Sequence, residues 1–157
     1  MSLFKRLFGK RESSLIDPVF GTLHVEVIKD IYGKKQSNQT YYGFIVLDRL
    51  EVKIILQDYH VDSAEGRYEL FRFIQVNFDQ FKEKLIPFLK KELERALDER
   101  ISDFNYDEDM VFQKLMLPAC SDLETAKWSM QFYHLPTDCF FLVDMLHQEV
   151  LAVHRVD

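Results

Sequence analysis

The sequence predicts an α+β domain in which strands come first, helices follow and strands return, giving one mostly antiparallel sheet of about six to seven strands packed on a central helical pair. Apolar and polar residues alternate in the first and last thirds of the chain, whereas the middle third has a three- and four-residue period. The length of 157 residues, 47% of them hydrophobic, is sufficient for one domain with a buried hydrophobic core. We expect a basic segment at 1–12 and a single domain at 17–157.

The first strands follow the turn sequence "DPVFG" at 17–21. In "TLHVEVI" Leu23 and Val25 alternate with His24 and Glu26, which predicts a half-buried strand. The polar stretch 33–39 is expected to be a loop. "TYYGFIVLD" and "LEVKIILQDYH" then continue a three-stranded meander, because β-branched and aromatic residues dominate them.

Two helices are expected next, at roughly 64–76 and 78–97, where apolar residues recur at helical spacing. Asp62 and Glu65 resemble a capping box at the first helix, and Asn77 is a candidate cap for the second. Pro87 predicts a kink or a restart, because it removes a backbone donor.

Strand periodicity returns after residue 110. "VFQKLML" predicts a strand that ends at Pro118, and "AKWSMQF" places Trp128 and Met130 on one face with Ala126 and Phe132. "CFFLVDML" and "EVLAVHRV" predict a closing hairpin joined near 147–148.

Charge and motif content exclude several functions. Residues 1–12 carry a net charge of +3 within a chain of net −6, so the remainder is acidic and argues against nucleic-acid binding. Phosphate-binding loops, dinucleotide turns and serine-hydrolase elbows are absent from the sequence, which holds five glycines. We therefore expect no cofactor and no enzymatic activity. Two cysteines, no secretory signal and no bilayer-spanning apolar run favour a cytoplasmic location.

The stretch "DFNYDED" at 103–109 alternates side-chain oxygens as a calcium loop does. Aligned on an EF-hand loop, it has Glu108 where the turn needs glycine and Lys114 where the closing glutamate belongs. We therefore expect a polar connection without a metal, and a calcium loop of another type is the alternative. The histidines and cysteines show no zinc spacing. An enzyme using His24, Glu26 or His134 as a general base remains an alternative, without a recognisable nucleophile.

We interpret the acidic segment 98–109 as a binding site for a cationic protein partner. It holds six carboxylates and one arginine, with two aromatic residues among them as candidate anchors. The candidate partner-binding residues are Asp98, Glu99, Asp103, Phe104, Tyr106, Asp107, Glu108 and Asp109.

On a helix, the N-terminal segment "MSLFKRLFGK" would place its apolar residues in a stripe beside its basic residues, which is typical of a short amphipathic helix. Its candidate docking or membrane-contact residues are Leu3, Phe4, Lys5, Arg6, Leu7 and Phe8. Docking on its own domain or on a partner is preferred, because two turns are marginal alone in water. A peripheral membrane adaptor is the alternative.

The sequence "DPVFGTLHVEV", the later strands and charged helix, and the strand "WSMQF" before a closing hairpin resemble small bacterial proteins of unknown function that open on a D-P-x-F-G turn. These proteins are similar in layout to immunity-type proteins encoded beside polymorphic toxins. Asp17, Pro18, Phe20, Gly21 and Trp128 carry the resemblance. It implies a non-enzymatic protein that neutralises a bacterial toxin through an acidic surface, and it carries over no functional residues.

Overall fold

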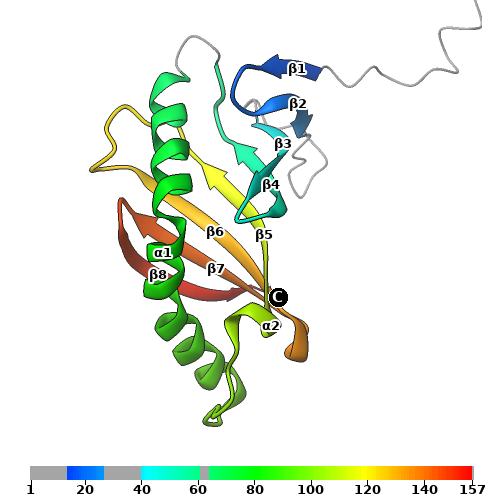
Figure 1. Ribbon diagram of the computed structural model, residues 1–157, viewed down its shortest axis with the longest axis vertical. Helices are drawn as coiled ribbons and strands as arrows, with labels where there is room; N and C mark the ends of the chain where they lie inside the picture. Colours follow the sequence, from blue (N-terminus) through cyan, green and yellow to red (C-terminus); the bar gives the residue numbers. More distant parts are fainter. Residues whose placement is uncertain (1–13, 27–39, 61–63, 157) are drawn as a thin grey trace, which may run out of the picture.

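Eight strands form one sheet in the computed structural model, which describes residues 14–26, 40–60 and 64–156 (Figure 1). They lie side by side in the order of the chain. The strands are β1 (Ser14–Asp17), β2 (Gly21–Glu26), β3 (Thr40–Leu47), β4 (Leu50–Leu56), β5 (Met110–Leu117), β6 (Lys127–His134), β7 (Cys139–Leu146) and β8 (Glu149–Val156).

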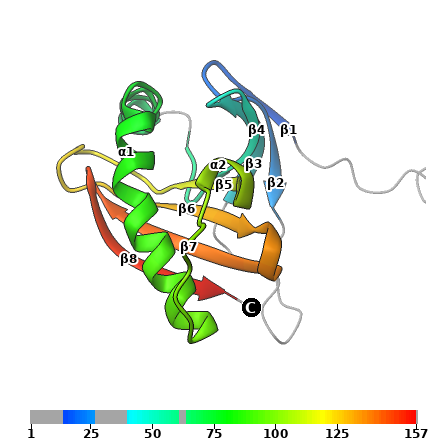
Figure 2. The same cartoon turned by 60° about the horizontal axis from the view of Figure 1, so that its bottom comes forward.

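All neighbouring strands are antiparallel except β4 and β5, which are parallel. A parallel pair needs a crossover connection, and the long helix α1 (Glu65–Leu97) supplies it. The helix lies across one face of the sheet in both views (Figure 2). The predicted α+β architecture with a mostly antiparallel sheet is therefore confirmed, with eight strands in place of six to seven.

The predicted helical pair is wrong, because α1 is continuous through 65–97. The Asn77 side chain donates to the Phe73 carbonyl 2.8 Å away within the helix and caps nothing. Pro87 lies inside the helix at an exposed position, where water can satisfy the carbonyl that loses its donor. Burial of Phe78, Phe81 and other apolar residues along one face holds the helix together across the proline.

The helix ends also differ from expectation. Ala64 occupies the N-cap without a side-chain hydrogen bond, and Asp62 of the proposed capping box lies outside the described residues. Asp98 closes the C-terminus with a left-handed φ of 53°, and its backbone N–H donates to the Glu94 carbonyl. A second helix, α2 (Tyr106–Asp109), has a single turn, and Asn105 is its N-cap.

Strand β1 was not expected from the sequence. It precedes the Pro18 turn, and its four residues pair with β2 alone, from Ser14 opposite His24 to Asp17 opposite Gly21. The residues around it, "ESSLIDPVFG", are typical of a turn. Its strand conformation therefore depends on a neighbour that the local sequence does not specify.

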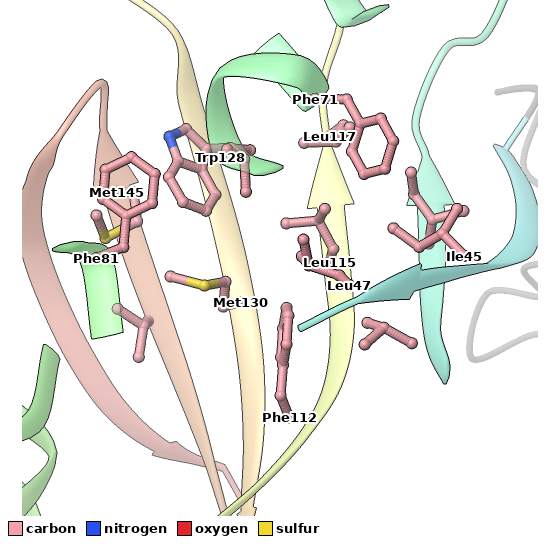
Figure 3. Close-up of a cluster of buried hydrophobic side chains, with 14 of the residues drawn as sticks. Ile45, Leu47, Phe71, Phe81, Phe112, Leu115, Leu117, Trp128, Met130 and Met145 are labelled. Atoms are coloured by element: carbon pink, nitrogen blue, oxygen red, sulfur yellow. The ribbon is translucent and has the colours of Figure 1, made fainter. Parts of the chain in front are cut away.

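The hydrophobic core lies between α1 and the face of the sheet that α1 covers (Figure 3). Trp128, Met130 and Phe132 of β6 are buried on that face, as their alternation predicted. The rings of Phe81 on α1 and Trp128 meet edge to face with centroids 5.3 Å apart. The closing hairpin is confirmed, with β7 and β8 joined at His147, whose φ is 49°.

Candidate functional site

A buried carboxylate in the "DPVFG" turn forms the densest polar cluster near the start of the described chain. Asp17 is 2% exposed and accepts hydrogen bonds from the backbone N–H groups of Val19 at 2.8 Å and Phe20 at 2.7 Å. The Tyr68 hydroxyl donates to it at 2.6 Å, and the Tyr59 hydroxyl also donates to it. Burial raises the pKa of the Asp17 carboxyl, but these hydrogen bonds outweigh burial and hold the pKa below its ordinary value.

A buried cation, Arg67, directly precedes Tyr68 of this cluster in the sequence. Arg67 is 1% exposed and donates through Nε to the Pro118 carbonyl at 2.8 Å. Its Nη2 nitrogen donates to the carbonyls of both Gln57 and Asp58. Its guanidinium carbon lies 5.4 Å from the centre of the Tyr59 ring. Burial lowers the pKa of Arg67. The residue joins the ends of β4 and β5 to the first turn of α1.

The clusters around Asp17 and Arg67 stabilise the fold. The oxygens of Asp17 and the donors of Arg67 point at the protein's own groups, and neither residue lines the hollows described below. Four residues of the "DPVFG" stretch thus make a turn: Asp17 accepts from the turn amides, Pro18 follows it, Phe20 enters the core and Gly21 adopts a φ of 72°.

The candidate catalytic histidines are separated. His24 lies on β2 beside Tyr42, with ring centroids 5.4 Å apart, while His134 is buried at the end of β6 and stacks on Phe104. Burial lowers the pKa of His134, against the charge of Asp109. The Glu26 side chain lies outside the described residues. His134 Nδ1 lies 2.7 Å from the hydroxyl of Thr137, three residues along the chain, so this contact is a local one at the end of β6.

Ser129, Asp144 and His154 do meet on the uncovered face of the sheet. The Ser129 hydroxyl donates to Asp144 at 2.7 Å, and His154 Nε2 lies 3.4 Å from the other Asp144 oxygen. A serine-hydrolase triad requires the imidazole between the hydroxyl and the carboxylate. Here the carboxylate is in the middle, so the histidine cannot take the serine proton.

Hollows are present on the described part of the molecule, but they do not gather the candidate catalytic residues. One of about 370 Å³ involves Trp128, Ser129 and Asp144, one of about 290 Å³ lies beside β3, and one of about 230 Å³ is lined by Pro87, Phe88 and Lys91. Neither His24 nor His134 lines any of them.

Metal ligands are not gathered in the described residues, which contain no group of three or more histidine, cysteine or acidic side chains able to hold an ion. Cys120 and Cys139 are free thiols. No helix in the described ranges is both long and apolar enough to cross a bilayer. The N-terminal candidates, residues 3–8, lie outside the described residues.

The acidic segment 98–109 links α1 to β5 and is fastened to the body at several points. Lys82 of α1 forms an ion pair with Asp107, which raises the pKa of Lys82. The Asn105 side chain accepts from the Asp107 N–H at 3.2 Å, and the Asn105 N–H donates to Asp109 at 2.8 Å. Glu94 accepts from the Ile101 N–H at 3.1 Å.

The two aromatic residues of the segment face the core. Phe104 stacks on His134 with centroids 6.3 Å apart, and Tyr106 meets Phe132 edge to face at 6.0 Å. Burial raises the pKa of the Tyr106 hydroxyl. Both side chains are half-buried, so they position the segment more than they project from it as anchors.

Four carboxylates of the segment remain turned to solvent: Asp98, Glu99, Asp103 and Glu108 are exposed and have no ion pair among the described residues. Asp98 and Glu99 follow directly after the C-terminus of α1, where the helix dipole disfavours negative charge. Asp107 and Asp109, in contrast, are engaged in the local structure. The expected site residues thus divide into a structural set and a set available to a partner.

Sequence reasoning missed Lys82, which neutralises Asp107 from a position 25 residues earlier. It also missed Asp48, in the turn between β3 and β4, whose charge raises the pKa of both Lys82 and Tyr106. In the sequence, 50 residues separate Asp48 from Asp98. No local sequence signal marks either residue, because both enter through the fold.

Comparisons with known proteins add no relative: no family model, curated protein or solved structure matches this chain.

Proposed function

We propose that the protein is a non-enzymatic binding module that holds a cationic protein partner at the acidic segment 98–109, and that it acts as an immunity protein neutralising a bacterial toxin. The resemblance to immunity-type proteins motivates the toxin, since a nuclease toxin with an anionic substrate presents a basic surface. An inhibitor of this kind needs a rigid scaffold and complementary charge, with no catalytic group.

One observation supports the proposal: the exposed carboxylates Asp98, Glu99, Asp103 and Glu108 form no ion pair among the described residues. Asp98 and Glu99 are unfavourable for the helix itself, because negative charge at the C-terminus of α1 costs about 0.3–1 kcal/mol per residue. Their backbone is nevertheless held in place by the packing of Phe104 and Tyr106 and by the Lys82–Asp107 pair. A fixed set of unpaired charges lowers the ordering cost of binding a charged partner.

The test is co-purification of the tagged full chain from its native cells, joined to rescue of toxicity caused by genes next to its own. The binding variant combines Asp98→Asn, Glu99→Gln, Asp103→Asn and Glu108→Gln. It spares Asp107 and Asp109, whose loss would also disturb α2.

The matched control removes the same number of charges elsewhere, with Glu65→Gln, Glu69→Gln, Glu83→Gln and Glu124→Gln at exposed positions. We expect a stoichiometric basic partner that the control retains and the binding variant loses. Equal binding by both variants would reject the acidic segment as the site, and rescue by neither the wild type nor the control would reject immunity.

A further inference from the structure

Strand β8 lies at one end of the sheet, and its outer edge is open. Among the described residues it pairs with β7 alone, from Glu149 opposite Leu146 to Val156 opposite Phe140. The backbone groups on its other side have no strand partner in this part of the chain. An edge of this kind can pair with another extended strand.

The side chains of β8 are apolar for such an open position. Every residue of the strand is exposed or half-buried, although five of its eight residues are apolar: Val150, Leu151, Ala152, Val153 and Val156. Leu151 is 52% exposed and Val156 is 40% exposed. The strand contains neither proline nor lysine, which natural edge strands use to block pairing. A shift in register opposite Asp144 and Met145 interrupts the strand near its start and leaves 152–156 regular.

Helix α1 adds a second apolar surface beside this edge. It crosses over β8 in both views, and Lys84 Nζ lies 3.3 Å from a carboxylate oxygen of Glu149 at the start of the strand (Figures 1 and 2). Phe88 lies one helical turn further, on the same side of α1, and is 46% exposed. Together with Pro87 and Lys91 it lines an apolar hollow of about 230 Å³.

The same side of α1 follows β8 toward its end. The pKa of Glu92, one turn beyond Phe88, is lowered by its hydrogen bond to Arg95 and by the charge of His154. Phe88 therefore lies between two points at which the helix acts on the strand. A specific interface buries about 800 Å² on each partner, which a strand edge alone does not reach. The exposed side of α1 enlarges the surface that a partner of β8 can contact.

The charges of β8 fit a second copy of the same strand. Glu149 lies at its start and Arg155 near its end, and Glu149 stays 76% exposed beside Lys84. Two such strands in antiparallel orientation place the start of each beside the end of the other, so opposite charges meet twice. With His154 neutral the strand has no net charge, in a chain of net −6. A cationic partner gains nothing from such a strand, whereas two acidic copies can approach each other there with little local repulsion.

We propose that the protein forms a homodimer in which the β8 strands of two copies pair antiparallel across a two-fold axis. The two sheets join into one, both α1 helices lie on the same face of it, and Phe88 of each copy lies toward the seam. The contact is isologous and closes on itself, so one surface of each copy is sufficient. It uses other residues than the acidic segment and does not depend on the proposed function.

The test measures the molecular mass of the full chain over a range of concentrations by sedimentation equilibrium, together with hydrogen exchange of the β8 amides. Leu151→Lys and Leu151→Glu each place a charge at an exposed position of the edge. Ile16→Lys and Ile16→Glu are the matched controls, because Ile16 is 82% exposed on β1 at the opposite end of the sheet. Circular dichroism verifies that each variant is folded.

We expect a dimer whose β8 amides exchange more slowly as the protein concentration rises. Both Leu151 variants should dimerise about tenfold more weakly, because near a two-fold axis each copy meets its own charge, while the Ile16 variants stay within about twofold. A monomer at every concentration, or a dimer that the Leu151 variants leave unchanged, would overturn the inference. Opposite effects of lysine and glutamate at Leu151 would also overturn it, because they indicate a charged partner other than a second copy.

A charge exchange tests the antiparallel direction. Glu149→Arg gives the strand two basic ends, and Arg155→Glu gives it two acidic ends. Each variant alone should dimerise about tenfold more weakly, whereas an equimolar mixture of the two should recover a heterodimer within about twofold of the wild-type affinity. A mixture that associates no more tightly than the single variants would reject the antiparallel pairing. None of these measurements involves a toxin, so the dimer and the proposed function are tested separately.

Discussion

Two buried charged residues, Asp17 and Arg67, show how single side chains organise the strand ends near the start of α1. Neither is paired with the other; each is satisfied by hydrogen bonds to neutral groups. A buried charge is tolerated when hydrogen bonds replace its hydration. These residues are therefore expected to matter for folding and to leave partner binding unaffected.

Replacement of Asp17 by asparagine should lower the free energy of unfolding at neutral pH by about 1.5–3 kcal/mol, the range for hydrogen bonds to a charged group. The amide would place donors against the N–H of Phe20 or the hydroxyl of Tyr68. Urea denaturation measures the change. Glu124→Gln, at an exposed position, is the control and should stay within about 0.5 kcal/mol.

The same variant predicts a pH dependence. The pKa of Asp17 is lowered in the folded protein, so its stabilisation is fully present above the ordinary value of 3.8 and is lost as pH falls through the folded value. The stability gap between wild type and Asp17→Asn should therefore narrow below about pH 3.8. A constant gap down to pH 2 would contradict the lowered pKa.

At the scale of the element, α1 depends on close contact between its first turn and the loop after β5. A Cβ at Gly66 would overlap the Cys120 carbonyl. Arg67 donates to Pro118 in the same loop, which keeps the two segments together. Glycine is required here by the approach of another backbone, although it weakens a helix interior.

The change Gly66→Ala should therefore lower stability by about 1–3 kcal/mol, because overpacking against a backbone carbonyl outweighs the gain of about 1 kcal/mol in helix propensity. Thermal unfolding followed by circular dichroism tests it. Gln80→Ala, at an exposed position of the same helix, is the control and should be close to neutral. Increased stability in Gly66→Ala would show that the loop can retreat at little cost.

At the scale of the whole molecule, negative charge is concentrated at one segment. Residues 98–109 carry a net charge of −5 in a chain of net −6. Like charges on neighbouring residues repel, and the packing of Phe104 and Tyr106 holds their segment in place. The fold therefore bears a local electrostatic cost that partner binding would relieve.

Neutralising Asp98, Glu99, Asp103 and Glu108 should raise stability at low ionic strength by about 0.2–0.5 kcal/mol for each like-charge pair relieved. The gain should fade near 1 M salt, where the screening length is about 3 Å. Melting curves at both ionic strengths measure it. A loss of stability at low salt would show that these carboxylates have stabilising partners, contrary to their placement here.

Much of the architecture was predictable from local patterns. Alternation in "AKWSMQF" and in the closing hairpin predicted β6, β7 and β8, because a half-buried strand must place apolar residues on one side. Strand β1 and the continuity of α1 were not predictable. The first depends on pairing with β2, and the second on a buried face that outweighs Pro87.

The acidic segment was visible in the sequence as a run of charges, but its division into roles was not. Lys82 forms an ion pair with Asp107. Phe104 packs on His134, and Tyr106 packs on Phe132. These contacts join residues that are distant in the chain. The sequence by itself determined the fold class, the acidic character and the strands with strict alternation, since these follow from composition and short-range period. The tertiary structure alone decided which carboxylates face solvent and which are held within the fold, since packing between distant elements sets both.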